Sequence, residues 1–126
     1  MDKVVHFEIP VDDVERAQKF YSTAFGWKMN NIPGMGYTLI ETTPSDENGP
    51  KEPGAINGGI MKRSEKIKSP VITINVDNID EAVKTVNKNG GGVVVEKMKV
   101  GDMGYSAYIE DTEGNVIGLW QNLKGG

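Results

Sequence analysis

The sequence contains an internal repeat, in which a strand pattern and a helix pattern recur after 65 residues. Superposing residues 6–27 on residues 71–92 makes six of 22 positions identical, where composition alone would give roughly one or two. The identical residues of the first copy are Ile9, Val11, Asp12, Ala17, Lys19 and Gly26. A repeat of this kind predicts two modules with one architecture.

Each module is predicted to contain a strand, a helix and three further strands. Strict alternation predicts the opening strands at residues 4–11 and 71–76, and helical spacing predicts the helices at 12–26 and 78–91. The remaining strands are expected at residues 27–29, 37–42 and 55–62, and at 93–100, 105–111 and 116–122. The segment 44–54 has loop composition, and residues 124–126 are expected to form a frayed tail.

The predicted fold class is therefore α+β. Two tandem βαβββ modules, residues 1–63 and 69–126, make a single domain over residues 1–126, and their curved sheets are expected to pair and form a cup. Asp12, with Glu15 three residues later, is the expected N-cap of the first helix. Helical spacing also places Phe20 on the apolar face that this helix would bury, and Trp27 is expected to pack at the helix end.

Alternation along the strands assigns side chains to the two faces of each sheet. The helix-covered face would carry Phe7, Ile9, Ile60, Ile72, Ile74 and Leu119. The cup would be lined by His6, Glu8, Gly59, Met61, Val71, Thr73, Gly118 and Trp120. With Tyr37, the side chains of Met61 and Trp120 could form an apolar wall for a ligand, or pack as core or dimer surface.

Charge and composition exclude several classes of function. A formal net charge of −4 argues against a nucleic-acid or membrane partner, and the absence of cysteine excludes thiolate metal sites and cysteine nucleophiles. The amino-terminal segment lacks the apolar run of a signal peptide, and no run approaches the ~18 residues of a membrane span. A cytoplasmic protein is the expectation.

Two long motifs resemble the vicinal oxygen chelate superfamily, the group of glyoxalases, bleomycin-resistance proteins and dioxygenases. HFEIPVDDVERAQKFYSTAFGW resembles its opening motif, and YIEDTEGNVIGLWQ resembles its closing strand pair. The stretches GGIMKR and GLWQ are similar to those of a glyoxalase-related branch of small proteins. The resemblance covers nearly the whole chain and implies the cup-forming fold, but this fold serves many activities.

The resemblance also implies where metal-using members place their ligands, on the first and last strand of each module. These positions fall on His6, Gly59, Val71 and Gly118. Only His6, the single histidine of the chain, has a side chain that could bind a metal, whereas a catalytic divalent site needs about three protein ligands. We therefore expect no metal and no other cofactor.

Three functions stay open at this point. The chain could bind a small apolar or amphipathic molecule in the cup through His6, Glu8, Met61, Thr73 and Trp120. It could be a metal-independent enzyme that uses His6 or Glu8 as acid or base, although His6 could instead be hydrogen-bonded within the protein and Glu8 could be a solvated carboxylate at the rim of the cup. The cup could also be vestigial and serve as a dimer or partner surface. A homodimer is expected, mainly from the resemblance.

Overall fold

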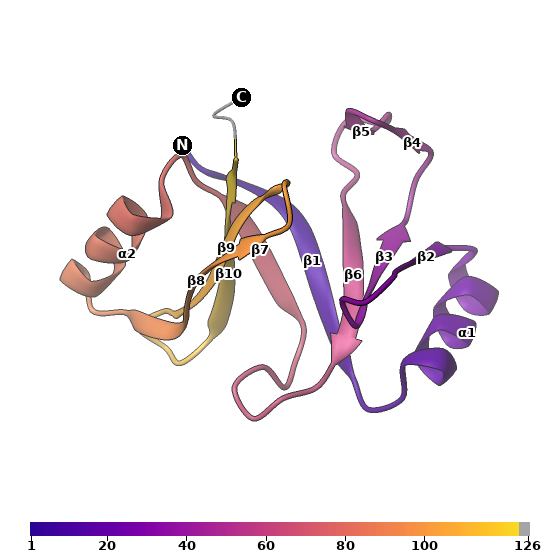
Figure 1. Cartoon of the computed structure of the whole chain (residues 1–126), viewed down its shortest axis with the longest axis horizontal. Coiled ribbons are helices and arrows are strands. Elements are labelled where there is room, and N and C mark those ends of the chain that lie inside the picture. Colours follow the sequence, from indigo (N-terminus) through magenta and orange to yellow (C-terminus); the bar gives the residue numbers. More distant parts are fainter. Residues whose placement is uncertain (124–126) are drawn as a thin grey trace. The chain divides into compact units, whose positions relative to one another are not determined.

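The computed structural model describes residues 1–123, so the tail expected at residues 124–126 lies outside the described part. The first elements in chain order are β1 (Lys3–Val11), α1 (Val14–Phe25), β2 (Lys28–Ile32), β3 (Tyr37–Glu41), β4 (Ser45–Asp46), β5 (Gly49–Pro50) and β6 (Asn57–Lys62) (Figure 1). They are followed by β7 (Val71–Asn75), α2 (Ile79–Lys88), β8 (Gly92–Val100), β9 (Gly104–Glu110) and β10 (Val116–Asn122). The α+β class is confirmed.

The chain divides into two compact units. Unit 1 comprises Met1–Val5 and Val71–Gly126, and unit 2 comprises His6–Pro70. The strands of unit 1 lie in the order β7-β10-β9-β8, and those of unit 2 in the order β2-β3-β6-β1. The boundaries expected for the modules and the cup between them stay predictions. Within residues 1–123, no helix combines the length and the apolar composition that crossing a membrane requires.

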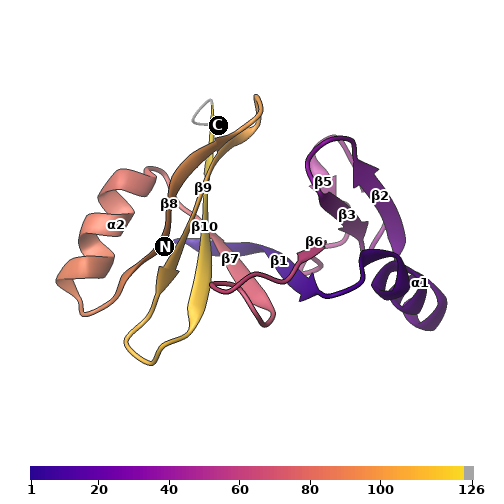
Figure 2. The same cartoon turned by 60° about the horizontal axis from the view of Figure 1, so that its bottom comes forward.

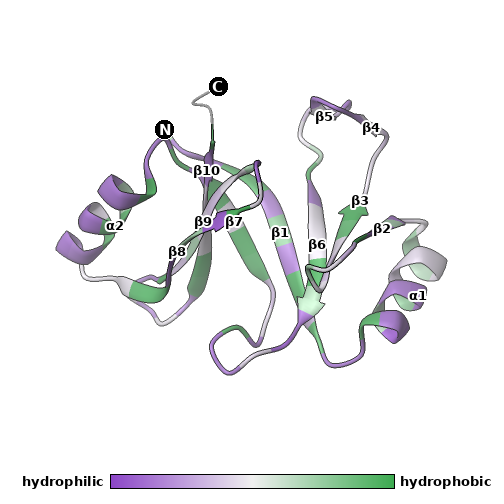
Figure 3. Cartoon of the chain, in the orientation of Figure 1, coloured by the Kyte–Doolittle hydropathy of each residue, from purple (hydrophilic) through white to green (hydrophobic). Residues whose placement is uncertain are grey.

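Unit 1 has an apolar core between α2 and its sheet. Figure 2 shows α2 lying beside β8, β9 and β10. The buried members are Val76, Ile79, Ala107, Ile109 and Leu119. In Figure 3 the hydrophobic residues of this unit gather on the strands, whereas α2 is mostly hydrophilic. Ile79 is fully buried because it faces the sheet in the first turn of the helix.

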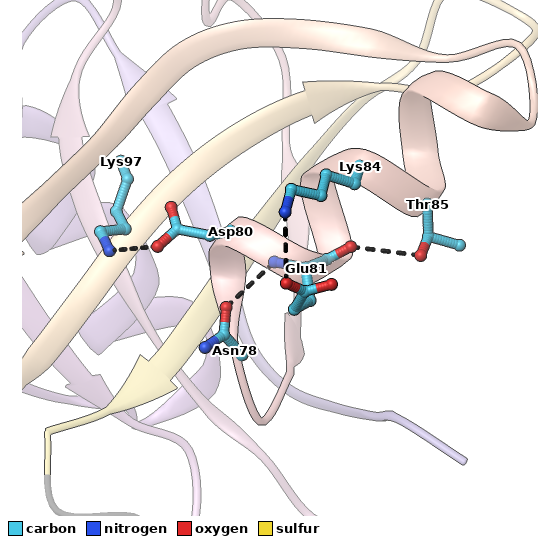
Figure 4. A network of polar contacts seen from close by, with 6 residues as sticks. All are labelled: Asn78, Asp80, Glu81, Lys84, Thr85 and Lys97. Carbon is cyan, nitrogen blue, oxygen red and sulfur yellow. Dashed lines mark hydrogen bonds and ion pairs between the residues drawn. The ribbon is translucent and has the colours of Figure 1, made fainter.

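Polar contacts fix the start of α2 (Figure 4). Asn78 is the N-cap, and its side chain accepts a hydrogen bond from the backbone N–H of Glu81 at 3.0 Å. Asp80 lies in the first helical turn, where its charge suits the positive end of the helix, and it pairs with Lys97 of β8 at 2.8 Å. The helix is thereby joined to the edge strand of its own sheet.

Unit 2 holds its helix differently, because α1 has no buried residue. The side-chain amide of Gln18 donates to Thr38 and to Asn31, each at 2.7 Å, and Thr38 donates to Asn31 at 2.8 Å. Phe20 is 57% exposed, so the expectation that it lies on a buried face is wrong. The half-buried residues of α1 are Val14, Ala17, Gln18, Tyr21 and Ser22, so the helix face toward the sheet is rotated away from Phe20.

Aromatic rings cluster at the carboxyl end of α1. Tyr21 stacks on Trp27 with ring centroids 5.1 Å apart, and Phe7 of β1 lies 5.8 Å from Trp27. Trp27 therefore packs at the helix end, as predicted. Phe25 is 5.7 Å from Trp27 but stays 62% exposed.

Local interactions correct the expected start of α1. The N-cap is Asp13, whose side chain accepts from the Arg16 N–H at 3.0 Å, and Asp12 instead pairs with Arg63 at 2.7 Å. The position matches Asn78 of α2 at the repeat spacing of 65 residues, so the repeat holds at the level of the caps.

Other boundaries also differ from the expectations. The segment 44–54 contains the short β4–β5 hairpin, because Gly49 (φ 106°) closes a tight turn in which Asp46 accepts from Asn48. The second helix ends at Lys88, before its predicted glycines. Ile72 is 46% exposed, although alternation placed it on the helix-covered face.

Candidate functional site

Strand register in unit 2 brings three titratable side chains together. His6 and Glu8 are two residues apart on β1 and therefore share one face. β1 runs parallel to β6 with Glu8 opposite Gly59, and β3 runs antiparallel to β6 with Tyr37 opposite Met61. The Tyr37 side chain reaches across Gly59 to the two β1 residues.

The hydroxyl of Tyr37 bridges His6 and Glu8. It donates to Glu8 Oε2 at 2.8 Å and lies 2.7 Å from His6 Nε2. A tyrosine hydroxyl has one proton, which the bond to Glu8 uses, so His6 Nε2–H must donate to the hydroxyl oxygen. The other ring nitrogen, Nδ1, is then a hydrogen-bond acceptor. We call His6, Tyr37 and Glu8 the polar cluster.

Burial lowers the pKa of the histidine in this cluster. Desolvation lowers the pKa of the His6 imidazole below its ordinary value of 6.5, while the nearby Glu8 carboxylate acts in the opposite direction. The imidazole is therefore neutral at neutral pH. Glu8 is only 7% exposed, which is unusual for a carboxylate, and it accepts a hydrogen bond from the Tyr37 hydroxyl.

Gly59 makes room for the Tyr37 ring. A Cβ atom built on Gly59 would collide with the hydroxyl and ring carbons of Tyr37. The position where the family resemblance implies a metal ligand is thus occupied by an aromatic side chain from the neighbouring strand. Only glycine at residue 59 permits the bridge to His6 and Glu8 in this geometry.

The donors present do not fit a catalytic divalent metal centre. The polar cluster has one imidazole and one carboxylate, and His6 Nε2 is engaged by Tyr37. In unit 1 the two implied positions are Val71 and Gly118, which have no donor side chain. Across residues 1–123, no three His, Cys, Asp or Glu side chains are grouped closely enough to hold an ion.

Unit 1 repeats this strand arrangement with Val71 and Thr73 at the positions of His6 and Glu8. Here β10 runs parallel to β7 with Gly118 opposite Thr73, as Gly59 is opposite Glu8 in unit 2. A Cβ atom on Gly118 would lie 2.9 Å from Thr73 Oγ1 and 3.5 Å from Val71. The space beside Gly118 is therefore bounded by Thr73 and Val71, both buried.

Trp120 lies on the face of the unit 1 sheet away from α2. Its neighbour Leu119 packs in the helix-covered core, so alternation directs the indole to the other face. The indole N–H donates to Asn122 at 2.9 Å, and the ring covers Gly104 of β9. The tryptophan is held by contacts within its own unit.

The residues predicted to bind a ligand are thus divided between the units. His6, Glu8 and Met61 lie in unit 2, where the first two meet through Tyr37; Thr73 and Trp120 lie in unit 1. Their roles stay predictions. Tyr37 was predicted from the sequence only to form part of an apolar wall, and the role of its hydroxyl was missed. Gly59, which is opposite Glu8 of β1, was a usable signal because a glycine leaves room for a side chain from the neighbouring strand.

Sequence reasoning also missed Asn75. Its side-chain oxygen is buried and makes no hydrogen bond to any of residues 1–123. A buried amide oxygen without a donor is destabilising, by about 1–3 kcal/mol. We found no sequence signal that separates Asn75 from an ordinary strand residue.

Comparisons with known proteins agree with this fold. The family model described as bleomycin resistance protein-like N-terminal matches residues 3–43. A glyoxylase-like domain-containing protein of Didymella fabae is 36% identical over 110 residues, which cover 86% of this chain and 84% of the relative. CFP32 of Mycobacterium tuberculosis, named as a glyoxylase, is 32% identical over 122 residues.

The lengths of the relatives differ. The match to CFP32 covers 90% of this chain but 43% of that protein, so the chain spans less than half the length of this relative. Among solved structures, methylmalonyl-CoA epimerase of Mycobacterium tuberculosis superposes with a TM-score of 0.62 over 94% of this chain and 87% of its own. Its sequence identity is 16%, so this likeness concerns the fold alone.

Proposed function

The chain belongs to the glyoxylase-like proteins of the vicinal oxygen chelate superfamily, and we propose that it is a metal-independent member that binds a small apolar or amphipathic molecule. The observation that carries this proposal is the Tyr37 hydroxyl bridging His6 and Glu8. A tyrosine ring fills the position over Gly59 where metal-using members are expected to have a ligand. The same face offers an orienting group for a ligand without an ion.

Apolar side chains beside the polar cluster support an amphipathic ligand. Leu39 is opposite Gly59 on β3 and shares a face with Tyr37, two residues earlier. It is 37% exposed, and Met61 on β6 is half-buried. A ligand would place its polar end at the cluster and its apolar part against these two side chains.

A thermal-shift screen tests the proposal, with divalent metals in one set and small metabolites in another. A ligand at 100 times its Kd should stabilise the folded protein by about 2.7 kcal/mol. Tyr37→Phe keeps the ring over Gly59 but removes the bridging hydroxyl, so it should reduce the shift. The control is Ser106→Ala. Ser106 is opposite Trp120 in unit 1, as Tyr37 is opposite Met61 in unit 2, and its substitution should leave the shift unchanged.

The proposal would be rejected if protein purified without added metal contained stoichiometric zinc, nickel or iron. It would also be rejected if only divalent ions stabilised the protein. Stabilisation by an organic ligand that is equal in wild type and Tyr37→Phe would place binding away from the polar cluster.

A second candidate is a metal-free enzyme that uses His6 or Glu8 as acid or base. The neutral His6 imidazole with an acceptor nitrogen favours it, because a general base must be unprotonated at working pH. Turnover of small carbonyl compounds that His6→Gln abolishes, and whose rate falls as His6 is protonated, would support this alternative over simple binding.

We also propose that the chain forms homodimers. Sedimentation at micromolar concentration should give twice the 13.7 kDa mass of one chain. A single species of 13.7 kDa across that range would reject the dimer.

A further inference from the structure

We infer that the polar cluster selects ligands presenting a hydrogen-bond donor, an alcohol or a protonated amine, and disfavours ligands presenting an oxyanion. The inference rests on the proposed function and names the chemistry of its ligand. It follows from how the protons within the cluster are distributed.

Both proton donors of the cluster are used internally. The Tyr37 proton is donated to Glu8 at 2.8 Å, and the His6 Nε2 proton is donated to Tyr37 at 2.7 Å. What His6 can offer a ligand is therefore the lone pair of Nδ1, which accepts and cannot donate. Glu8, as a carboxylate, also only accepts.

Charge acts in the same direction as hydrogen bonding. Glu8 brings a negative charge that is 7% exposed, and the neutral imidazole beside it brings no positive charge. Poor screening in a buried setting strengthens attraction to a cation and repulsion of an anion. An oxyanion would meet lone pairs and a like charge, whereas an ammonium or hydroxyl group would find acceptors.

This preference is opposite to that of a metal centre. A divalent ion offers positive charge to an anionic oxygen. Here the corresponding position over Gly59 holds Tyr37, whose hydroxyl proton is already donated in a hydrogen bond to Glu8. A site with Tyr37 over Gly59 thus favours donors, whereas a site with a metal ion there would favour oxyanions.

Three probes with one apolar body test the inference: benzylamine, benzyl alcohol and benzoate. The chain has a single histidine, so nitrogen-detected NMR of the full chain reports on His6 without ambiguity. We expect benzylamine and benzyl alcohol to shift the Nδ1 signal, and benzylamine to bind at least about tenfold more tightly than benzoate.

Two variants complete the experiment. Glu8→Gln removes the charge and adds a donor, so the preference for benzylamine over benzoate should fall about tenfold. If that variant does not fold, Tyr37→Phe serves instead, because His6 then loses its Nε2–H acceptor and the Nδ1 response to benzylamine should weaken. Ser106→Ala in unit 1 is the control and should behave like wild type.

The inference is overturned if benzoate binds as tightly as benzylamine, or if no probe at millimolar concentration shifts the His6 signal. Its failure can be distinguished from failure of the proposed function by the metabolite screen. A stabilising organic ligand that Tyr37→Phe weakens would preserve the proposed function while the donor preference is rejected.

Discussion

Apart from the β4–β5 hairpin of unit 2, the two units have the same order of elements, but their helices pack differently. In unit 1, α2 closes an apolar core in which Ile79 is fully buried. In unit 2, α1 buries no residue and is held by the hydrogen bonds of Gln18 to Thr38 and Asn31. Apolar packing of the helix against its sheet is thus more extensive in unit 1 than in unit 2.

On the sheet faces away from the helices, unit 2 has the more elaborate set of contacts. Glu8 is opposite Gly59 in unit 2, and Thr73 is opposite Gly118 in unit 1. In unit 2 a tyrosine ring lies over the glycine beside a buried carboxylate, whereas in unit 1 Gly118 lies beside the Thr73 hydroxyl and is opposite Tyr108 of β9. One backbone arrangement therefore carries His6 and Glu8 in unit 2, and Val71 and Thr73 at the corresponding positions of unit 1.

Truncating the first residue of each helix should give the largest difference in stability loss between the two units. Ile79→Ala leaves a cavity beneath α2 and should lower the free energy of unfolding by about 2–5 kcal/mol. The matched variant is Val14→Ala, which lies at the same repeat position in α1 and is only half-buried, so its cost should be clearly smaller. Urea unfolding measures both, and equal losses would contradict the difference in core packing.

Substituting alanine for Gly59 in unit 2 and for Gly118 in unit 1 compares the sheet faces on which these glycines lie. Gly59→Ala would push the Tyr37 ring away from His6 and Glu8, and should destabilise by about 1–3 kcal/mol. Gly118→Ala meets chiefly the Thr73 hydroxyl at 2.9 Å, and this short side chain can shift, so the loss should be smaller. Thermal unfolding gives the order, and the His6 NMR signal should move only in Gly59→Ala.

The fold was largely predictable from the repeat, because the spacing of 65 residues relates both helices and both caps. The polar cluster was predictable only in part. Alternation placed His6 and Glu8 on one face, but it cannot say that Tyr37, 29 residues from Glu8, donates to it. That pairing depends on the register of β3 on β6 and on the missing side chain of Gly59.

The exposure of Phe20 could not be read from periodicity either. Helical spacing identifies a broad apolar face, but not which side of it meets the sheet. In unit 2 the half-buried face includes Gln18, which donates to Thr38 and Asn31, and Phe20 lies outside it. The N-cap is Asp13, and Asp12 pairs with Arg63, a contact between distant parts of the chain that the local pattern cannot show.

Acidification should act on unit 2 through His6. Its folded pKa is lowered from 6.5 by burial, so between the folded pKa and 6.5 the unfolded chain binds more protons. The free energy of unfolding should therefore fall as pH drops below 6.5, and the loss is complete below the folded pKa. Urea midpoints from pH ~7.5 to ~5 should show this slope in wild type and lack it in His6→Gln. The same slope in both proteins would contradict it.

The smallest effect is expected at the exposed aromatic face of α1. Phe20 is 57% exposed and its ring contacts are with Tyr21 and Phe25 on the same helix, so Phe20→Ala should cost less than about 1 kcal/mol. Thr85 is the matching position of α2 and is also exposed, so Thr85→Ala is the control with a similarly small cost. Urea unfolding at two protein concentrations checks both variants. A loss in Phe20→Ala that grows with protein concentration would mean that a second copy covers this ring, and that α1 completes its packing only in the dimer.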